Sequence, residues 1–141
     1  RLPAGQERGH GGELLGIAHN GPATSPAIDA SYFPQPVAGP HWSATVDARS
    51  GGTGSWAVDF LDGYTVERFQ TNPLSVRLVR SVGAAGGSGY VINGDGTVTD
   101  LGTQLVWDRC VLGLSGPTCA GTAQALSWVA AQAAVKARNA S

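Results

Sequence analysis

The sequence predicts an α+β fold in which two helices pack on twisted antiparallel sheets, and three patterns predict it. Glycine-rich tight turns separate short β-branched runs in residues 90–107. Apolar and polar residues alternate in residues 55–60 and 74–79, as they do in strands with one buried face. Apolar residues recur at helical spacing in residues 121–139. The 141 residues, of which 42% are hydrophobic and 13% charged, are enough for one folded domain with a single core.

The N-terminal part predicts a short helix, a long loop and then strands. Residues 13–18 (ELLGIA) are expected to be helical, and four prolines in residues 22–39 predict an ordered irregular loop. Strands are expected over residues 41–45, 55–60, 64–69 and 74–79. In the second strand, alternation places Trp56, Val58 and Phe60 toward the core and Ser55, Ala57, Asp59 and Leu61 outward. In the fourth, Leu74, Val76 and Leu78 alternate with Ser75, Arg77 and Val79.

The C-terminal part predicts a linker, two tight turns and a helix. Residues 81–89 (SVGAAGGSG) are a flexible linker by composition, and a hairpin follows them rather than the helix that a nucleotide-binding loop requires. The hairpin turns at residues 93–96 (NGDG), and a second turn at Leu101 and Gly102 leads to a strand that ends at Trp107. Residues 121–139 are expected to be helical, with Thr122 as N-cap. The expected apolar face is Leu126, Val129, Ala130, Ala133 and Ala134.

The two cysteines, Cys110 and Cys119, allow three interpretations: a disulfide, part of a metal site, or two free thiols. Their spacing matches no common zinc signature and no His or Cys pair lies nearby, so a disulfide is favoured. A disulfide implies an oxidising compartment, hence a secreted or surface-displayed protein. An enzyme based on these thiols would need a reactive thiolate, which pairing removes.

Charge and motifs exclude several classes of function. The net charge is −1 with no run of Lys or Arg, so nucleic acid is not an expected partner. No apolar stretch reaches the ~18–20 residues that span a bilayer. His10, His19 and His41 are scattered, and no H-E-x-x-H, G-x-S-x-G or P-loop motif is present, so we expect no enzyme. The chain begins with Arg1 and contains no methionine, so we expect a processed or excised piece of a longer protein.

Residues 93–100 resemble a calcium loop only in outline. Calcium takes about six or more oxygen ligands, and NGDGTVTD lacks the spaced acids and the terminal Glu of an EF-hand. We therefore expect Asp95 and Asp100 to be solvated turn residues, and we expect no cofactor, with calcium as the one ion to test.

Residues 41–72 are the expected binding surface, because aromatic residues stand there beside amides and carboxylates. The candidate ligand-binding residues are Trp42, Asp47, Arg49, Asp59, Asp62, Tyr64, Glu67, Arg68, Gln70 and Asn72. Two alternatives stay open. In the first alternative, Trp42 and Trp56 pack in the core. In the second, the polar residues from Glu67 to Asn72 form an ordinary solvated face.

Two groups of segments resemble one known family, but in reversed order. Residues 93–107 (NGDGTVTDLGTQLVW), the two cysteines and residues 125–134 (ALSWVAAQAA) are similar to the opening of the Lcl C-terminal domain family. The family's second half resembles RLP at 1–3, ELLGIAHN at 13–20, PAIDASYFP at 26–34, HWSA at 41–44, SWAVDFLDGY at 55–64 and VRLVR at 76–80. Residues 4–12 (AGQERGHGG) do not align.

The resemblance implies an extracellular bacterial protein with a C-type-lectin-like fold whose halves are circularly permuted. Residues 1–80 would be the second half of the domain, residues 81–89 the linker and residues 90–141 the first half. In that fold the first and last strands pair side by side, so a short linker joins them easily. The fold displays ligand-binding loops just before its last strand, which corresponds to residues 41–72. The calcium-dependent sugar motifs of C-type lectins, Glu-Pro-Asn, Gln-Pro-Asp and Trp-Asn-Asp, are absent.

These observations predict a non-catalytic adhesin or receptor-binding module, secreted or surface-displayed, whose partner is a glycan or protein receptor on another cell or surface. The alternative is a structural subunit of a pilus, filament or tandem surface array, in which chains complete one another by exchanging half-domains.

Overall fold

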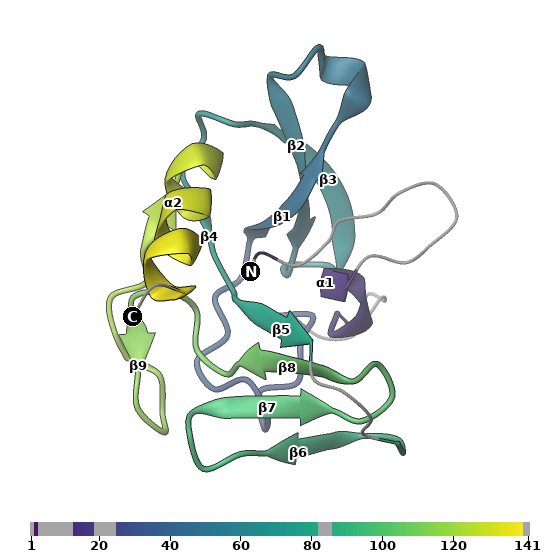
Figure 1. The fold of residues 1–141 in the computed structure, drawn as a ribbon, viewed down its shortest axis with the longest axis vertical. Coiled ribbons are helices and arrows are strands. Elements are labelled where there is room, and N and C mark those ends of the chain that lie inside the picture. The colour runs from purple at the N-terminus through teal and green to yellow at the C-terminus, as the bar shows by residue number, and fades with distance from the viewer. Residues whose placement is uncertain (1, 3–12, 19–24, 82–85, 140–141) are drawn as a thin grey trace.

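The computed structural model describes residues 2, 13–18, 25–81 and 86–139, which form an α+β fold with two main sheets (Figure 1). The first sheet has the spatial order β11 (Ala125–Leu126), β4 (Leu74–Ser75), β1 (Pro40–Val46), β2 (Gly54–Asp59) and β3 (Tyr64–Phe69). The second has the order β5 (Val79–Ser81), β8 (Leu105–Asp108), β7 (Thr97–Asp100) and β6 (Tyr90–Ile92). A small ribbon pairs β9 (Leu114–Ser115) with β10 (Ala120–Gly121). The helices are α1 (Glu13–Gly16), η1 (Ala48–Ser50) and α2 (Trp128–Asn139).

The hairpin elements agree with the sequence pattern. Strands β6, β7 and β8 form the predicted three-stranded meander, and β3 covers the residues predicted for it. Local turn chemistry explains this success. The carboxylate of Asp95 accepts hydrogen bonds from the main chain and hydroxyl of Thr97, and that of Asp100 accepts from the main chain of Gly102. The sheets are not purely antiparallel, however, because β1 and β4 pair in parallel.

The predicted strand over residues 74–79 is wrong, because this segment crosses from one sheet to the other. Ser75 pairs with β1 in the first sheet, whereas Val79 pairs with Trp107 in the second. All of residues 76–79 are buried, so the alternation of Arg77 and Val79 with apolar neighbours does not mark a solvent face. The crossover passes through the core between the sheets.

The C-terminal helix starts later than predicted. Ala120–Gly121 and Ala125–Leu126 form strands β10 and β11 instead. The hydroxyl of Ser127, not of Thr122, accepts the capping hydrogen bond from the main chain of Ala130. The buried face also differs. Ala131 and Val135 are buried, whereas Val129 is 66% exposed. Lys136 and Arg138 lie in the last turn of α2 as expected.

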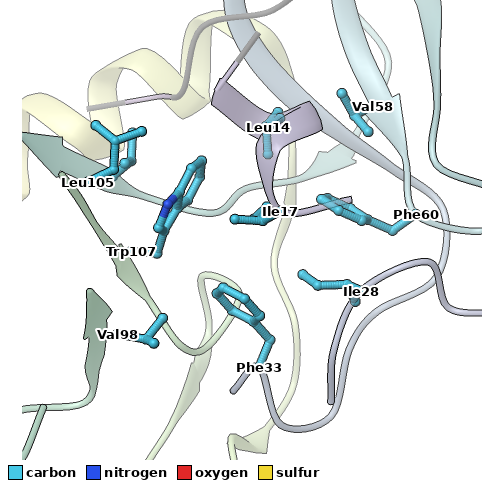
Figure 2. Close-up of a cluster of buried hydrophobic side chains, with 10 residues drawn as sticks. Leu14, Ile17, Ile28, Phe33, Val58, Phe60, Val98, Leu105 and Trp107 are labelled. Atoms are coloured by element: carbon cyan, nitrogen blue, oxygen red, sulfur yellow. The ribbon is translucent and has the colours of Figure 1, made fainter. Parts of the chain in front are cut away.

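Two clusters of buried side chains lie on either side of β2. The first joins both sheets and α1, as Figure 2 shows, and contains Leu14, Ile17, Ile28, Phe33, Val58, Phe60, Val79, Val98, Leu105 and Trp107. The second lies between the first sheet and α2 and contains Leu2, Trp42, Ala57, Leu74, Val76, Leu78, Ala131 and Val135. Ser55 and Ala57, which were expected to face outward, are therefore fully buried. Because both faces of β2 are buried, its side chains do not alternate between core and solvent, so Ser55 and Ala57 do not face outward as expected.

The linker prediction lies partly outside the described residues, which omit 82–85. The strands on either side of it, β5 and β6, do not pair with each other as the permuted arrangement led us to expect. They occupy opposite edges of the second sheet and are separated by β8 and β7. Each main sheet nevertheless combines strands from both proposed halves, since β11 pairs with β4 and β5 pairs with β8.

Replacing His41 with Gln is expected to flatten the pH dependence of stability. His41 is 1% exposed, and burial together with the charge of Arg77 lowers its pKa from 6.5 to about 3, against a hydrogen bond to the Gly39 carbonyl that raises it. In the unfolded chain His41 becomes protonated below about pH 6.5, whereas in the native protein it stays neutral down to about pH 3. Stability should therefore fall between these values, by up to about 1.4 kcal/mol per pH unit, and be unaffected by this group above 6.5.

Urea unfolding followed by tryptophan fluorescence at several pH values between 7 and 4.5 measures this. Carboxylates titrate in both proteins, so the difference between the wild-type and His41→Gln slopes isolates the imidazole. Parallel slopes would show that His41 does not drive the acid sensitivity.

The predicted disulfide is present, since Cys110 and Cys119 are bonded and close a short loop. Replacing both with Ala should lower the free energy of unfolding by about 2–3 kcal/mol, because the cross-link restricts the unfolded chain. Guanidinium unfolding with and without reductant checks this. Reductant should destabilise the wild type and leave the double Ala variant unchanged, and an equal response of both proteins would contradict the assignment.

Candidate functional site

The structure divides the predicted site residues between the core, three turns and the two faces of the β2–β3 ribbon. Trp42 is fully buried, and its indole N–H donates to the carbonyl of Leu126 at 2.7 Å, so it cannot reach a ligand. The alternative that Trp42 packs in the core is confirmed. The predicted binding surface thus loses one of its aromatic members.

Several other candidates hold turns and strand ends. The carboxylate of Asp59 accepts from the main chain of Leu61, and that of Asp62 accepts from the main chain of Tyr64. These bonds are Asx turns, which shape the hairpin between β2 and β3. The main chain of Asn72 donates to the carbonyl of Phe69 in the turn after β3. Gln70 is half-buried: its side-chain amide donates to the hydroxyl of Ser55, and its main-chain carbonyl accepts from the N–H of Trp128, the first residue of α2.

Glu67 and Arg68 point to opposite faces of β3. Glu67 lies opposite Trp56 in the register with β2, and Arg68 lies opposite Ser55. Successive side chains of a strand alternate between faces, so these two residues cannot contact one ligand surface together. Tyr64, 59% exposed, lies on the same face as Arg68.

One group of neighbouring residues does come together at the surface, and we call it the Arg49 surface: the buried Asp47, the half-buried Trp56 and the exposed Arg49, Glu67 and Phe69. The guanidinium of Arg49 lies over the Trp56 ring, 5.1 Å from its centroid. Its Nε and Nη2 each donate to the carboxylate of Asp47 at 3.2 Å, which makes a bidentate pair. Phe69, on the same face of β3 as Glu67, is 66% exposed.

Local sequence explains why the surface forms at the end of the β1–β2 hairpin, which projects from the body in Figure 1. The Asp47 carboxylate accepts from the main chain of Arg49 and so caps the turn η1, and Gly51 ends η1 with a φ of 63°. Gly54 leaves room for Glu67, whose Oε1 lies 2.6 Å from where a Cβ at position 54 would stand. A side chain at position 54 would therefore displace the carboxylate from the surface.

The charges of the Arg49 surface stabilise one another. Hydrogen bonds from Arg49 lower the pKa of the Asp47 carboxyl, and the same contact raises the pKa of Arg49. Both groups are therefore ionised at neutral pH. The ion pair holds the Arg49 guanidinium in one orientation over the Trp56 ring, and the Arg49 side chain is 65% exposed.

A second candidate site lies in a cleft of about 570 Å³ that the sequence analysis did not predict. The turn of residues 93–96, the disulfide loop of residues 109–117 and Arg138 of α2 line it. An adjoining cavity of about 320 Å³ shares Asp95, Asp108 and Arg138 with it and adds Arg80. The NGDG turn and the cysteine spacing are visible in the sequence. Their approach to the end of α2 is not, because it depends on long-range packing.

Two ion pairs lie in the lining of the cleft and the adjoining cavity. Nη1 of Arg138 lies 2.9 Å from the Asp108 carboxylate, and Nη2 of Arg80 lies 4.0 Å from that of Asp95. Burial raises the pKa of the Asp108 carboxyl, an effect that Arg138 and Arg77 oppose. The hydrogen bond from Thr97 lowers the pKa of Asp95.

The described residues contain no group of three or more His, Cys, Asp or Glu side chains that could hold a metal ion. Asp95 and Asp100, the carboxylates of the calcium-like stretch, cap separate turns. No helix in the described part of the chain is long and apolar enough to cross a membrane.

Comparison of the chain with protein-family models, curated proteins and solved structures finds no match in any of the three.

Proposed function

We propose that this protein is a secreted or surface-displayed recognition module that binds a partner without turning it over, and that the Arg49 surface makes the contact. The observation that carries this proposal is the exposed guanidinium of Arg49, stacked on Trp56 beside Glu67 and Phe69. Arg, Trp and other aromatic residues dominate the energetics of protein interfaces. Here the bidentate bond to Asp47 holds the arginine in place before binding, which reduces the entropy cost of association.

A protein receptor fits this surface better than a glycan. Sugar-binding sites commonly use an open aromatic face on which an apolar ring face packs. The Arg49 guanidinium already covers the Trp56 ring at 5.1 Å, so that face is occupied. The exposed groups that remain are a cation, the Glu67 carboxylate and the Phe69 ring, which match the mixed polar and apolar surface of a protein.

The disulfide supports an oxidising, extracellular location for this module. Membership of the Lcl C-terminal domain family, with a permuted C-type-lectin-like fold and a role as an adhesin, is our proposal from the sequence segments quoted above. The α+β class and the mixing of both chain halves in each sheet are compatible with it.

Replacing Trp56 or Glu67 with Ala should weaken receptor binding about tenfold or more. Screening the protein against arrays of recombinant receptor ectodomains and of glycans identifies a ligand, and surface plasmon resonance then compares variants. Arg68→Ala is the matched control, since Arg68 neighbours Glu67 in β3 but faces the opposite side. Equal losses for Glu67→Ala and Arg68→Ala would contradict the site, and binding to glycans alone would contradict a protein receptor. Unchanged thermal unfolding of each variant excludes loss of fold.

A second candidate function is assembly by half-domain exchange. Strand β11 completes the first sheet beside β4, and β5 completes the second beside β8, so each half of the chain supplies a strand to the other. The same backbone hydrogen bonds can form between two chains.

Size-exclusion chromatography with light scattering tests this assembly over a range of concentrations. The recognition proposal expects the mass of one chain at every concentration. Stable dimers or higher species that persist on dilution would favour exchange, and shortening the 81–89 linker should then increase them because a shorter linker disfavours closure within one chain.

A further inference from the structure

The cleft between the NGDG turn and the disulfide loop has the form of a small-ligand site. Its volume of about 570 Å³ lies within the range of protein ligand pockets. The main chain of Arg109 donates to the carbonyl of Gly96 at 3.1 Å, which fixes one wall against the other. The disulfide between Cys110 and Cys119 closes the loop that forms the second wall. The site is therefore largely formed before any ligand enters.

The lining alternates in charge rather than carrying one sign. Asp95, Asp108 and Arg138 line both the cleft and the adjoining cavity of about 320 Å³, and Arg80 lines the adjoining cavity. The two carboxylates line the same two cavities. Burial raises the pKa of Asp108, whereas Arg138 and Arg77 lower it, and the negative charge of Asp95 adds to the rise. A ligand with only negative charge would meet both carboxylates, and one with only positive charge would meet both guanidinium groups.

One of the two ion pairs is open to replacement. Arg80 and Asp95 are 59% and 60% exposed and lie 4.0 Å apart, a separation at which exposed pairs contribute little to stability. A ligand that supplies both charges can exchange with this pair at small cost. The pair of Arg138 and Asp108, at 2.9 Å, stays as the fixed part of the lining.

We propose that this cleft, together with the adjoining cavity that shares Asp95, Asp108 and Arg138 with it, binds a small zwitterion of the amino-acid or dipeptide class. Its ammonium group lies between Asp95 and Asp108, and its carboxylate lies against Arg80 and Arg138. Apolar atoms of Leu78, Val106 and Val135 in the adjoining cavity contact the uncharged part. This site is separate from the Arg49 surface, so it does not depend on the recognition role proposed above.

Titration of ¹⁵N-labelled protein with glycylglycine, followed by amide NMR spectra, tests the proposal. We expect saturable shifts of the Gly94, Gly96 and Gly113 amides in the cleft. Succinate carries only negative charge and putrescine only positive charge, so each should bind at least about tenfold more weakly. No saturable shift with glycylglycine up to about 10 mM, or equal binding of all three compounds, would overturn the proposal.

Two variants place the ligand in the cleft. Asp95→Asn keeps the oxygen that caps the turn and removes the charge, and Arg80→Gln removes the opposite charge from an exposed side chain. Each should weaken glycylglycine binding about tenfold or more. Asp62→Asn is the matched control, because Asp62 caps the β2–β3 turn in the same way as Asp95 caps its own, outside the cleft. If the Asp95 and Arg80 variants bind like the Asp62 variant, the cleft is not the site.

Discussion

The two main sheets are joined by the crossover of residues 74–81, which is buried over residues 76–79, and their arrangement depends on the hydrogen bonds of Arg77 at its centre. This side chain is 1% exposed, and its Nη1 donates to the carbonyls of Asp108 at 2.8 Å and Arg109 at 2.6 Å. Its guanidinium also lies over the Phe33 ring at 4.9 Å. A buried charge costs several kcal/mol unless polar groups surround it, so the fold must keep both carbonyls in place. The end of β8 is thereby fixed to the crossover. The backbone of the crossover makes similar contacts, since the carbonyls of Val76 and Leu78 accept hydrogen bonds from the main chains of Leu112 and Asp108.

Burial lowers the pKa of Arg77 only to about 10, so Arg77 remains charged at neutral pH and opposes protonation of the buried His41.

The sequence predicted those parts of the fold whose cause is local. The meander of β6, β7 and β8 follows from turn residues within a few positions, such as Asp95 with Thr97. The crossover could not be predicted, because the burial of Arg77 depends on carbonyls more than 30 positions away. The start of α2 was wrong for the same reason. Ala125 and Leu126 pair with β4, far off in the sequence, and this pairing removes them from the helix that their spacing favoured. Local propensity yields where a distant partner supplies better hydrogen bonds.

The candidate site was predicted only in part, and alternation explains both the success and the failure. The predicted segment contains the surface that we propose as the site, and Asp47, Arg49 and Glu67 lie near one another in it. Trp56 and Phe69 were left out although period-two spacing places Phe69 on the face of Glu67. Trp42 was included because an aromatic residue near polar ones resembles a binding residue, whereas its indole instead ties β1 to the carbonyl of Leu126. Composition shows which residues a segment offers, and only packing decides which of them reach solvent.

The two proposed sites differ in how they depend on the core. The Arg49 surface is built on β2, β3 and the turn between β1 and β2, all in the first sheet, from the bond between Asp47 and Arg49 and the stacking on Trp56, so it needs little from the second sheet. The cleft depends on distant parts of the chain, since Asp108 stands at the end of β8, where Arg77 holds its carbonyl from the buried side. Arg138 of α2 forms an ion pair with the Asp108 carboxylate, and α2 packs through Ala131 and Val135 on the second core cluster. Disturbing the crossover would therefore alter the cleft while leaving the Arg49 surface formed, because the cleft depends on packing between both sheets and α2, whereas neighbouring strands of one sheet position the Arg49 surface.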